Sequence, residues 1–289
     1  MRSSPSRGQG LPARRYRGWS SNSLAIVPRW GSGICLLWGL AWTPLAAEPV
    51  FVDLPGGRFT MGDPLGEPDE APVEVEVAPY RLMRLEVTNR QFADFVAVSG
   101  HVTDAERHGF GWTWSGRWQR HADADWRKPF AGSAGQDGPD HPVVQVSAND
   151  AAAFCAFYGW RLPTEQEWEF AARGTDGRRY PWGNVDPEAG QHANFGTVAC
   201  CAPDATDGHL RTAPVGSFPS GVTPFGLLDM AGNVWEWTST PHFSRPDWVS
   251  LRGGGWGNNP WCLRTTYRHG NPRDIGLDMV GFRCAADPA

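Results

Sequence analysis

Residues 225–237, FGLLDMAGNVWEW, constrain the fold of this chain more than any other stretch. Three oxygen-bearing side chains, Asp229, Asn233 and Glu236, fall within eight residues, and glycines lie close by. Hard cations such as Ca²⁺ take carboxylate and carbonyl oxygens from bent, glycine-containing loops. Trp235 and Trp237 are two residues apart, so they face the same side of an extended segment. The stretch predicts a cation-binding bend that runs into a strand; the alternative is an aromatic core strand with polar neighbours.

The N-terminal part of the chain has the composition of an export signal. Residues 1–29 contain six arginines and no acidic residue, and residues 31–45 are apolar apart from small residues, Pro and Trp. Small residues end this run, so we expect cleavage after Ala47. The apolar run is too short for a permanent membrane span, so no stable membrane anchor is expected. These features predict a signal peptide at 1–47, a domain at 48–289, and a periplasmic or secreted location.

The composition of the remaining chain favours one loop-rich domain. About 240 residues can bury a sizeable core, and 35 Gly, 25 Pro and 16 Trp indicate that aromatic side chains rather than long elements fill it. The net charge of −5 excludes a basic nucleic-acid-binding surface as the main feature. Five cysteines follow the predicted signal peptide: Cys155, Cys200, Cys201, Cys262 and Cys284. An odd number in an exported protein leaves at least one thiol outside intramolecular disulfides.

Local patterns predict an α+β fold with two or three helices. Residues 51–62 read as two short strands around a Pro-Gly-Gly turn, and 73–77 alternate Val with Glu as a half-buried strand does. Residues 80–87 continue as a strand. Residues 101–140 are rich in turn residues and predict a long ordered loop.

Capping signals place the helices. Thr88 and Gln91 have the spacing of a capping box, and Gly100 is the stop signal of the helix that follows. A second helix is expected from residue 147 to 159. Thr164 and Glu167 open a third, which ends before a glycine at 174.

Seven motifs in this order resemble the formylglycine-generating enzyme (sulfatase-modifying factor) family. They are GGRFTMG (56–62), EVTNRQFA (86–93), GHVTDAER (100–107), RLPTEQEWE (161–169), YPWGN (180–184), GNVWEW (232–237) and GFRCA (281–285). The resemblance covers residues 51–287. It implies the irregular α+β fold of that family, which is related to C-type lectins and is low in regular secondary structure.

The resemblance also implies two calcium sites and a disulfide. The first site would use the side chains of Asn194 and Asp207 and the carbonyls of Phe195 and His209. The second would use the side chains of Asp229 and Glu236 and the carbonyls of Gly232 and Val234, which are part of the opening stretch. Cys155 and Cys284 match a family disulfide.

The catalytic motif of the family is only partly present. Formylglycine-generating enzymes bind copper through two cysteines that follow Gly-Gly-Ser, and soft thiolates suit Cu(I). Here Gly255 replaces the serine, Asn258 occupies the first cysteine position, and Cys262 is out of register with the second. Cys262, Trp235 and Asn258 are the candidate catalytic residues, with copper or iron as the metal such chemistry would need.

The other two cysteines leave several arrangements open. Cys200 and Cys201 could form a vicinal disulfide, one of them could bridge Cys262, or one could complete a thiolate pair with it. A structural role is favoured over a metal site.

Three functional classes remain; the first is the one we expect, and the other two are its alternatives. The first is an exported accessory or maturation protein that acts on a peptide or on a periplasmic enzyme. Cysteine-poor members of the family accompany copper nitrite reductases and pyoverdine-type siderophore pathways. The second is a formylglycine-generating oxidase for a sulfatase cysteine. The third is a calcium-stabilised binding module without catalysis.

Overall fold

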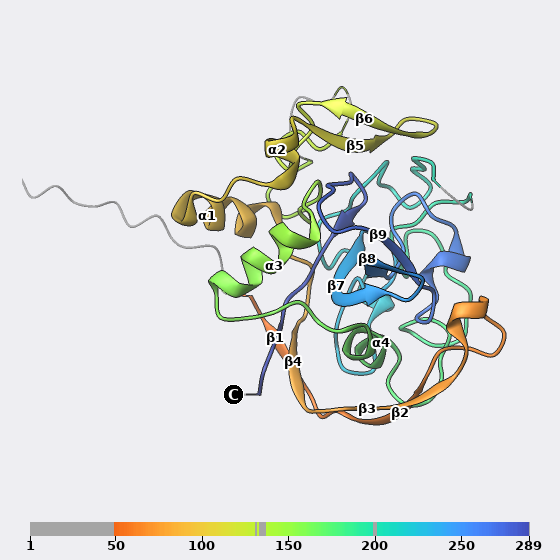
Figure 1. The fold of residues 1–289 in the computed structure, drawn as a ribbon. Coiled ribbons are helices and arrows are strands. Elements are labelled where there is room, and N and C mark those ends of the chain that lie inside the picture. The colour runs from red at the N-terminus through yellow and green to blue at the C-terminus, as the bar shows by residue number, and fades with distance from the viewer. Residues whose placement is uncertain (1–48, 131, 133–136, 199–200, 289) are drawn as a thin grey trace, which may run out of the picture. The chain divides into compact units, whose positions relative to one another are not determined.

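The computed structural model describes residues 49–130, 132, 137–198 and 201–288. The predicted signal peptide and its cleavage site lie outside these residues, as does Cys200. Among the described helices, none has the length and apolar character needed to cross a bilayer. The described chain mixes short helices, short strands and much irregular chain, which confirms the predicted α+β class (Figure 1).

A four-stranded sheet in the order β10-β7-β8-β9 forms the centre of the C-terminal half. Its strands are β7 (Trp235–His242), β8 (Arg245–Arg252), β9 (His269–Pro272) and β10 (Val280–Gly281). β7 and β8 form an antiparallel hairpin, β10 runs parallel to β7, and β9 is the outer strand. The polar residues of 229–233 thus lead directly into the central strand β7.

Three smaller sheets accompany the central sheet, two of them from the N-terminal strands. Their strands are β1 (Phe51–Leu54), β2 (Gly57–Met61), β3 (Val73–Val77), β4 (Tyr80–Met83), β5 (Phe110–Trp114), β6 (Trp118–Ala122) and β11 (Ala285–Ala286). The expected strands on either side of the Pro-Gly-Gly turn exist, but they do not pair with each other: β1 pairs with β4, and β2 pairs with β3. Gly56 explains the split, because it has a φ of +65° and a side chain there would meet the Val77 carbonyl oxygen at 2.3 Å.

The capping signals located the main helices correctly. The helices are α1 (Asn89–Ser99), α2 (Asp104–His108), α3 (Ala148–Phe157) and α4 (Glu165–Arg173), with 3-10 turns at Pro68–Glu70, Pro219–Gly221 and Pro260–Leu263. Capping boxes begin α1 at Thr88, α3 at Ser147 and α4 at Thr164. α3 and α4 both pack against β7, so two helices fix the position of this strand (Figure 1).

The expected long loop at 101–140 is wrong in its first half. Thr103 and Glu106 form a further capping box that opens α2, and Gly109 ends it in the left-handed conformation. Aromatic residues then alternate along β5, and Gly116, at a φ of +74°, makes the turn into β6. The period-two pattern was present in the sequence but was hidden by the many turn residues around it.

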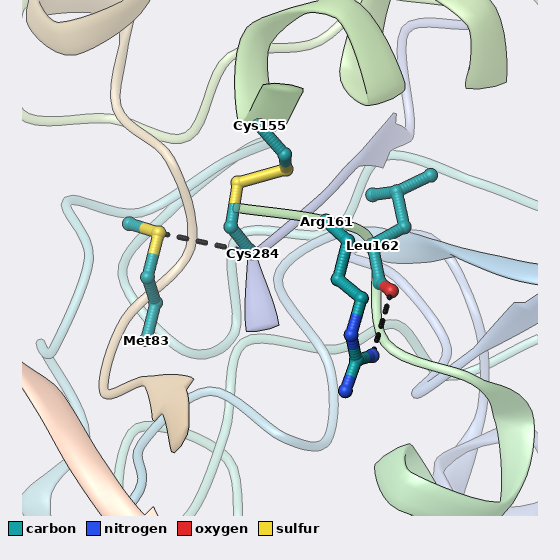
Figure 2. Close-up of a disulfide and its surroundings, with 5 residues drawn as sticks. All are labelled: Met83, Cys155, Arg161, Leu162 and Cys284. Carbon is teal, nitrogen blue, oxygen red and sulfur yellow. Dashed lines mark hydrogen bonds between the residues drawn. A yellow bond between two sulfur atoms is a disulfide. The ribbon is translucent and has the colours of Figure 1, made fainter. Parts of the chain in front are cut away.

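The disulfide that the resemblance implied is present between Cys155 and Cys284 (Figure 2). It joins α3 to the chain just before β11. The Met83 sulfur lies 3.4 Å from the Cys284 backbone nitrogen, and the Arg161 backbone N–H donates to the Ala285 carbonyl at 2.9 Å. The bond therefore ties α3, β4 and the C-terminal strand together.

Buried ion pairs hold the irregular segments. Arg252, which is fully buried, contacts Glu165 and Glu169 of α4 from β8. Arg264 pairs with Glu70, which links η3 (Pro260–Leu263) to the turn after β2. These guanidinium groups replace part of the hydrogen bonding that longer elements would supply.

Candidate functional site

An aromatic pocket of about 540 Å³ lies between the β5–β6 hairpin and the central sheet. We define the aromatic pocket by its lining residues: Trp112, Trp118, Cys201, Trp235, Trp248, Asn258, Cys262, Tyr267, His269, Asn271, Pro272, Ile275, Leu277, Met279 and Val280. The volume falls within the roughly 300–1,000 Å³ typical of ligand sites. All three candidate catalytic residues, Trp235, Asn258 and Cys262, line this one pocket.

Asn258 is built into the floor of the pocket. Its Oδ1 accepts hydrogen bonds from Trp235 Nε1 at 2.9 Å and from the Gly255 backbone N–H at 3.1 Å. Its Nδ2 lies 3.8 Å from the Cys201 sulfur. The residue at the family's first cysteine position therefore fixes the glycine-rich loop and the Trp235 ring.

The glycine at the family's serine position is required by packing. A side chain at Gly255 would place its Cβ 2.5 Å from Met279 Cγ, and one at Gly257 would meet Met279 Cε at 2.7 Å. Met279 follows the buried Asp278 and fills the space beside the loop. A side chain at either position would therefore require Met279 to move, and the cost is greater at Gly255, where the contact is with Cγ rather than with the flexible end of the side chain.

Cys262 carries a protonated thiol at neutral pH. Burial raises its pKa to about 11, while its hydrogen bond with Tyr267 lowers that pKa in part. Burial and the same thiol raise the pKa of Tyr267 to about 12. The thiolate is the form of cysteine that acts as a nucleophile or binds a metal. Because this environment favours the protonated thiol, Cys262 is poorly suited to either role.

Cys201 takes part in a disulfide. Its sulfur is therefore not a thiolate, and Cys262 titrates as a thiol rather than bridging to it. Of the alternatives left open for these cysteines, those that involve Cys200 lie outside the described residues. Within the described chain, two thiolates do not meet in the pocket.

The first predicted calcium set has an oxygen available for a cation. Asp207 accepts backbone hydrogen bonds from Phe195 at 3.0 Å and from His209 at 2.9 Å, and burial raises its pKa. Asn194 donates to the Arg211 carbonyl and to Asn233, but its Oδ1 is buried without a hydrogen-bond partner in the described chain. An unsatisfied buried carbonyl oxygen beside a carboxylate suits a hard cation.

In the second predicted calcium set, the carboxylate of Glu236 is already paired with a buried arginine. Both oxygens of Glu236 accept hydrogen bonds from Arg283 at 2.7–2.9 Å, and Trp168 Nε1 donates to one of them at 2.9 Å. Asp229, with a φ of +57°, accepts from the Gly216 backbone N–H, and burial raises its pKa to about 6. A cation here would share Glu236 with Arg283.

Glu86 adds a third buried carboxylate to this set. It accepts hydrogen bonds from Asn233 Nδ2 at 2.6 Å and from the Val234 backbone N–H at 3.3 Å. Burial raises its pKa well above the usual value, and the charges of Asp229 and Glu236 raise it further. Three carboxylates thus face one guanidinium, which is an excess of negative charge that protons or a cation must balance.

No group of three or more His, Cys, Asp or Glu side chains in the described chain is arranged to hold a metal. Both predicted calcium sets rely instead on one or two carboxylates with carbonyl oxygens, including the Gly232 carbonyl. Calcium therefore stays a prediction for both sets.

Sequence reasoning missed much of the pocket wall. Trp112 and Trp118 come from the hairpin that was expected to be loop, and Trp248 and Tyr267 come from segments without a recognised motif. Alternation of aromatic residues along 110–114 was the one signal that could have placed Trp112 on a strand face.

The fold and the site together define a formylglycine-generating-enzyme-like protein of the irregular, C-type-lectin-related kind. The family model "Sulfatase-modifying factor enzyme 1-like domain" matches residues 42–288, and the chain belongs to this family.

Several known proteins are similar over most of their length. The mouse (Mus musculus) protein "Inactive C-alpha-formylglycine-generating enzyme 2" is 40% identical over 289 residues, covering 88% of this chain and 92% of that protein. The formylglycine-generating enzyme of Thermomonospora curvata is 38% identical over 287 residues, covering 82% and 93%. The solved structure of PvdO from Pseudomonas aeruginosa matches with a TM-score of 0.67 and 27% identity, covering 83% of this chain and 95% of that one.

Proposed function

We propose that this chain is an exported accessory or maturation protein that binds a peptide segment of a periplasmic enzyme in the aromatic pocket. The partner suggested by the resemblance is a redox enzyme such as a copper nitrite reductase. The proposal includes the predicted signal peptide as the export route and excludes formylglycine formation by a copper–dithiolate site.

The observation that carries this proposal is the position of Asn258. It stands where the family has a copper-binding cysteine, and its amide is used to hold Trp235 and the Gly255 N–H. A neutral amide with committed hydrogen bonds supplies no soft ligand. The pocket has aromatic walls and a volume of about 540 Å³, which supports a binding role that does not need a thiolate pair.

The alternative, a formylglycine-generating oxidase, is favoured by one observation: Cys262 lines the same pocket. We propose a direct test with the purified mature protein, copper or iron, oxygen, a reductant and a cysteine-containing sulfatase peptide. The expected result is that no aldehyde forms. Aldehyde that disappears in Cys262→Ser would establish the oxidase and overturn the accessory function.

The identity of the partner enzyme can be tested by deleting the gene in the source organism. Deletion of the gene should lower the activity of the partner enzyme, and the wild-type gene should restore it. Trp248→Ala, in the pocket, should fail to restore activity, whereas Trp261→Ala, outside the pocket and 39% exposed, should succeed. Unchanged nitrite reductase activity in the deletion strain would exclude that partner.

Calcium is proposed as a structural cofactor of this function. The mature protein should retain about two calcium ions, because each predicted set offers side-chain oxygens together with carbonyls. Elemental analysis after mild purification measures this directly. Protein that keeps no calcium and is fully stable in chelator would support neither site, and the third function, a calcium-stabilised module without catalysis, would fall with them.

A further inference from the structure

Two exposed arginines stack on tryptophans that line the aromatic pocket. The Arg120 guanidinium carbon lies 5.3 Å from the ring centre of Trp112, and that of Arg245 lies 4.2 Å from the ring centre of Trp248. Arg120 is paired opposite Trp112 across the β5–β6 hairpin, so both project from the same face. A stacked guanidinium keeps its N–H edge available for a carboxylate.

Neither arginine is neutralised by a neighbour. The ion pairs of the described chain include neither Arg120 nor Arg245. The three segments that bring these side chains to the pocket, 117–122, 245–250 and 269–274, hold four arginines against two aspartates. These segments therefore carry a net positive charge although the whole chain is negative.

The interior of the pocket is largely apolar. Its lining contains no acidic side chain among the described residues, and most of its wall is aromatic or aliphatic. The nearest carboxylates that act on the lining, Glu67 and Glu70, are bound to Trp261 and Arg264. A cationic side chain that entered would find no carboxylate in the lining itself, and it would approach two guanidinium groups. An aromatic side chain can instead stack on the pocket walls.

The outer strand of the central sheet borders this pocket. β9 contributes His269, Asn271 and Pro272 to the lining, and within the described chain only β8 pairs with it. An edge strand beside a pocket is a template for an extended peptide, whose backbone pairs with the strand while a side chain enters the pocket.

We propose that the aromatic pocket binds an extended peptide segment in which an aromatic side chain is flanked by aspartate or glutamate. The aromatic ring occupies the pocket, and the flanking carboxylates contact Arg120 on one side and Arg245 on the other. This inference rests on the proposed peptide-binding function and specifies the class of peptide.

The test uses three synthetic pentapeptides with blocked ends and the mature protein, measured by isothermal titration calorimetry. The probes are a phenylalanine flanked by aspartates, a phenylalanine flanked by lysines, and an alanine flanked by aspartates. The acidic phenylalanine peptide should bind most tightly. Arg120→Gln and Arg245→Gln should each weaken it about three-fold and the double variant about ten-fold, as expected for exposed charge pairs.

Two controls separate specific contacts from general charge. Arg58→Gln removes an exposed arginine from β2, where it pairs with Glu76 rather than with the pocket, and should leave binding unchanged. Raising the salt from about 0.1 M to about 1 M shortens the screening length from about 10 Å to about 3 Å and should weaken the acidic peptide but not its residual binding to the double variant.

The outcomes are distinct. Equal or tighter binding of the lysine peptide, or an Arg58→Gln effect as large as that of Arg120→Gln, would overturn the inference while leaving peptide binding intact. Tight binding of the alanine peptide would exclude the pocket as the site of the aromatic ring. Failure of all three peptides to bind would overturn the inference and count against the peptide-binding function itself.

Discussion

Removal of the Cys155–Cys284 disulfide should cost a large share of the stability of this domain. The bond closes a loop with a sequence separation of 129 residues. The loop-entropy relation for a closed segment of that size gives about 5 kcal/mol at 25 °C. Because domains of this kind are stable by about 5–15 kcal/mol, the double variant Cys155→Ala/Cys284→Ala should be marginally stable.

Urea unfolding followed by tryptophan fluorescence measures the effect at fixed pH and calcium. A matched control is Cys262→Ala, because Cys262 is also buried, at 6% exposure, and its loss reports only the removal of a buried sulfur. The double variant should lose about 3–5 kcal/mol more than this control, since strain and residual structure reduce the full entropic value. A difference below about 1 kcal/mol would refute the assignment of stability to loop closure.

Two further perturbations follow from the buried carboxylates and from Asn258. In chelator, the raised pKa of Asp229, about 6, favours folding below the ordinary carboxyl pKa, and this contribution is lost as pH rises through 6. In chelator, Asp229→Asn should therefore reduce the fall in the free energy of unfolding between pH 4 and pH 6 by up to about 3 kcal/mol. In calcium, the same variant should lose the rise in Tm that calcium gives the wild-type protein, and a Tm change of equal size in calcium and in chelator would contradict a metal role for Asp229. Asn258→Ala leaves Trp235 Nε1 and the Gly255 N–H without their acceptor, so it should lower the free energy of unfolding by about 2–4 kcal/mol in the same urea assay. The control, Asn259→Ala, loses a single capping hydrogen bond from the Trp261 N–H and should lower it by about 1 kcal/mol. Similar costs for the two asparagine variants would show that the Asn258 contacts are weak.

Local signals in the sequence predicted three of the four α-helices of the described chain, because a helix can be specified by its own ends. The boxes at Thr88 and Thr164 fix the first turns through contacts three residues apart, so neighbouring residues suffice to locate them. The box at Thr103, which opens α2, has the same spacing but was not recognised. Strand partners were not predictable in the same way. β1 and β2 are separated by two residues, yet their partners are β4 and β3, because Gly56 lets the Val77 carbonyl approach the turn.

The composition of the candidate site depends on tertiary contacts that no single segment contains. Trp112, Trp235 and Tyr267 reach one pocket from a hairpin, a central strand and an irregular segment. The motif resemblance brought in Trp235, Asn258 and Cys262 because they lie in or beside recognisable motifs. It could not indicate that Glu86 and Arg283, far apart in the chain, meet at the second predicted calcium set.

Restoring the missing cysteine should not restore formylglycine formation. In Asn258→Cys the new thiol would stand at the family position, but Trp235 Nε1 and the Gly255 N–H would lose the acceptor that holds them. The serine of the family motif cannot be added alongside it without displacing Met279, which lies 2.5 Å from a Cβ at Gly255. Burial raises the pKa of the remaining thiol, Cys262, to about 11, so this thiol is protonated at neutral pH before any metal binds. We therefore expect no aldehyde from Asn258→Cys or from Gly255→Ser/Asn258→Cys in the copper, oxygen and reductant assay, with mass spectrometry of the peptide as the readout. Aldehyde formed by the single variant would show that one side chain, rather than the packing of the whole loop, separates this chain from the formylglycine-generating enzymes.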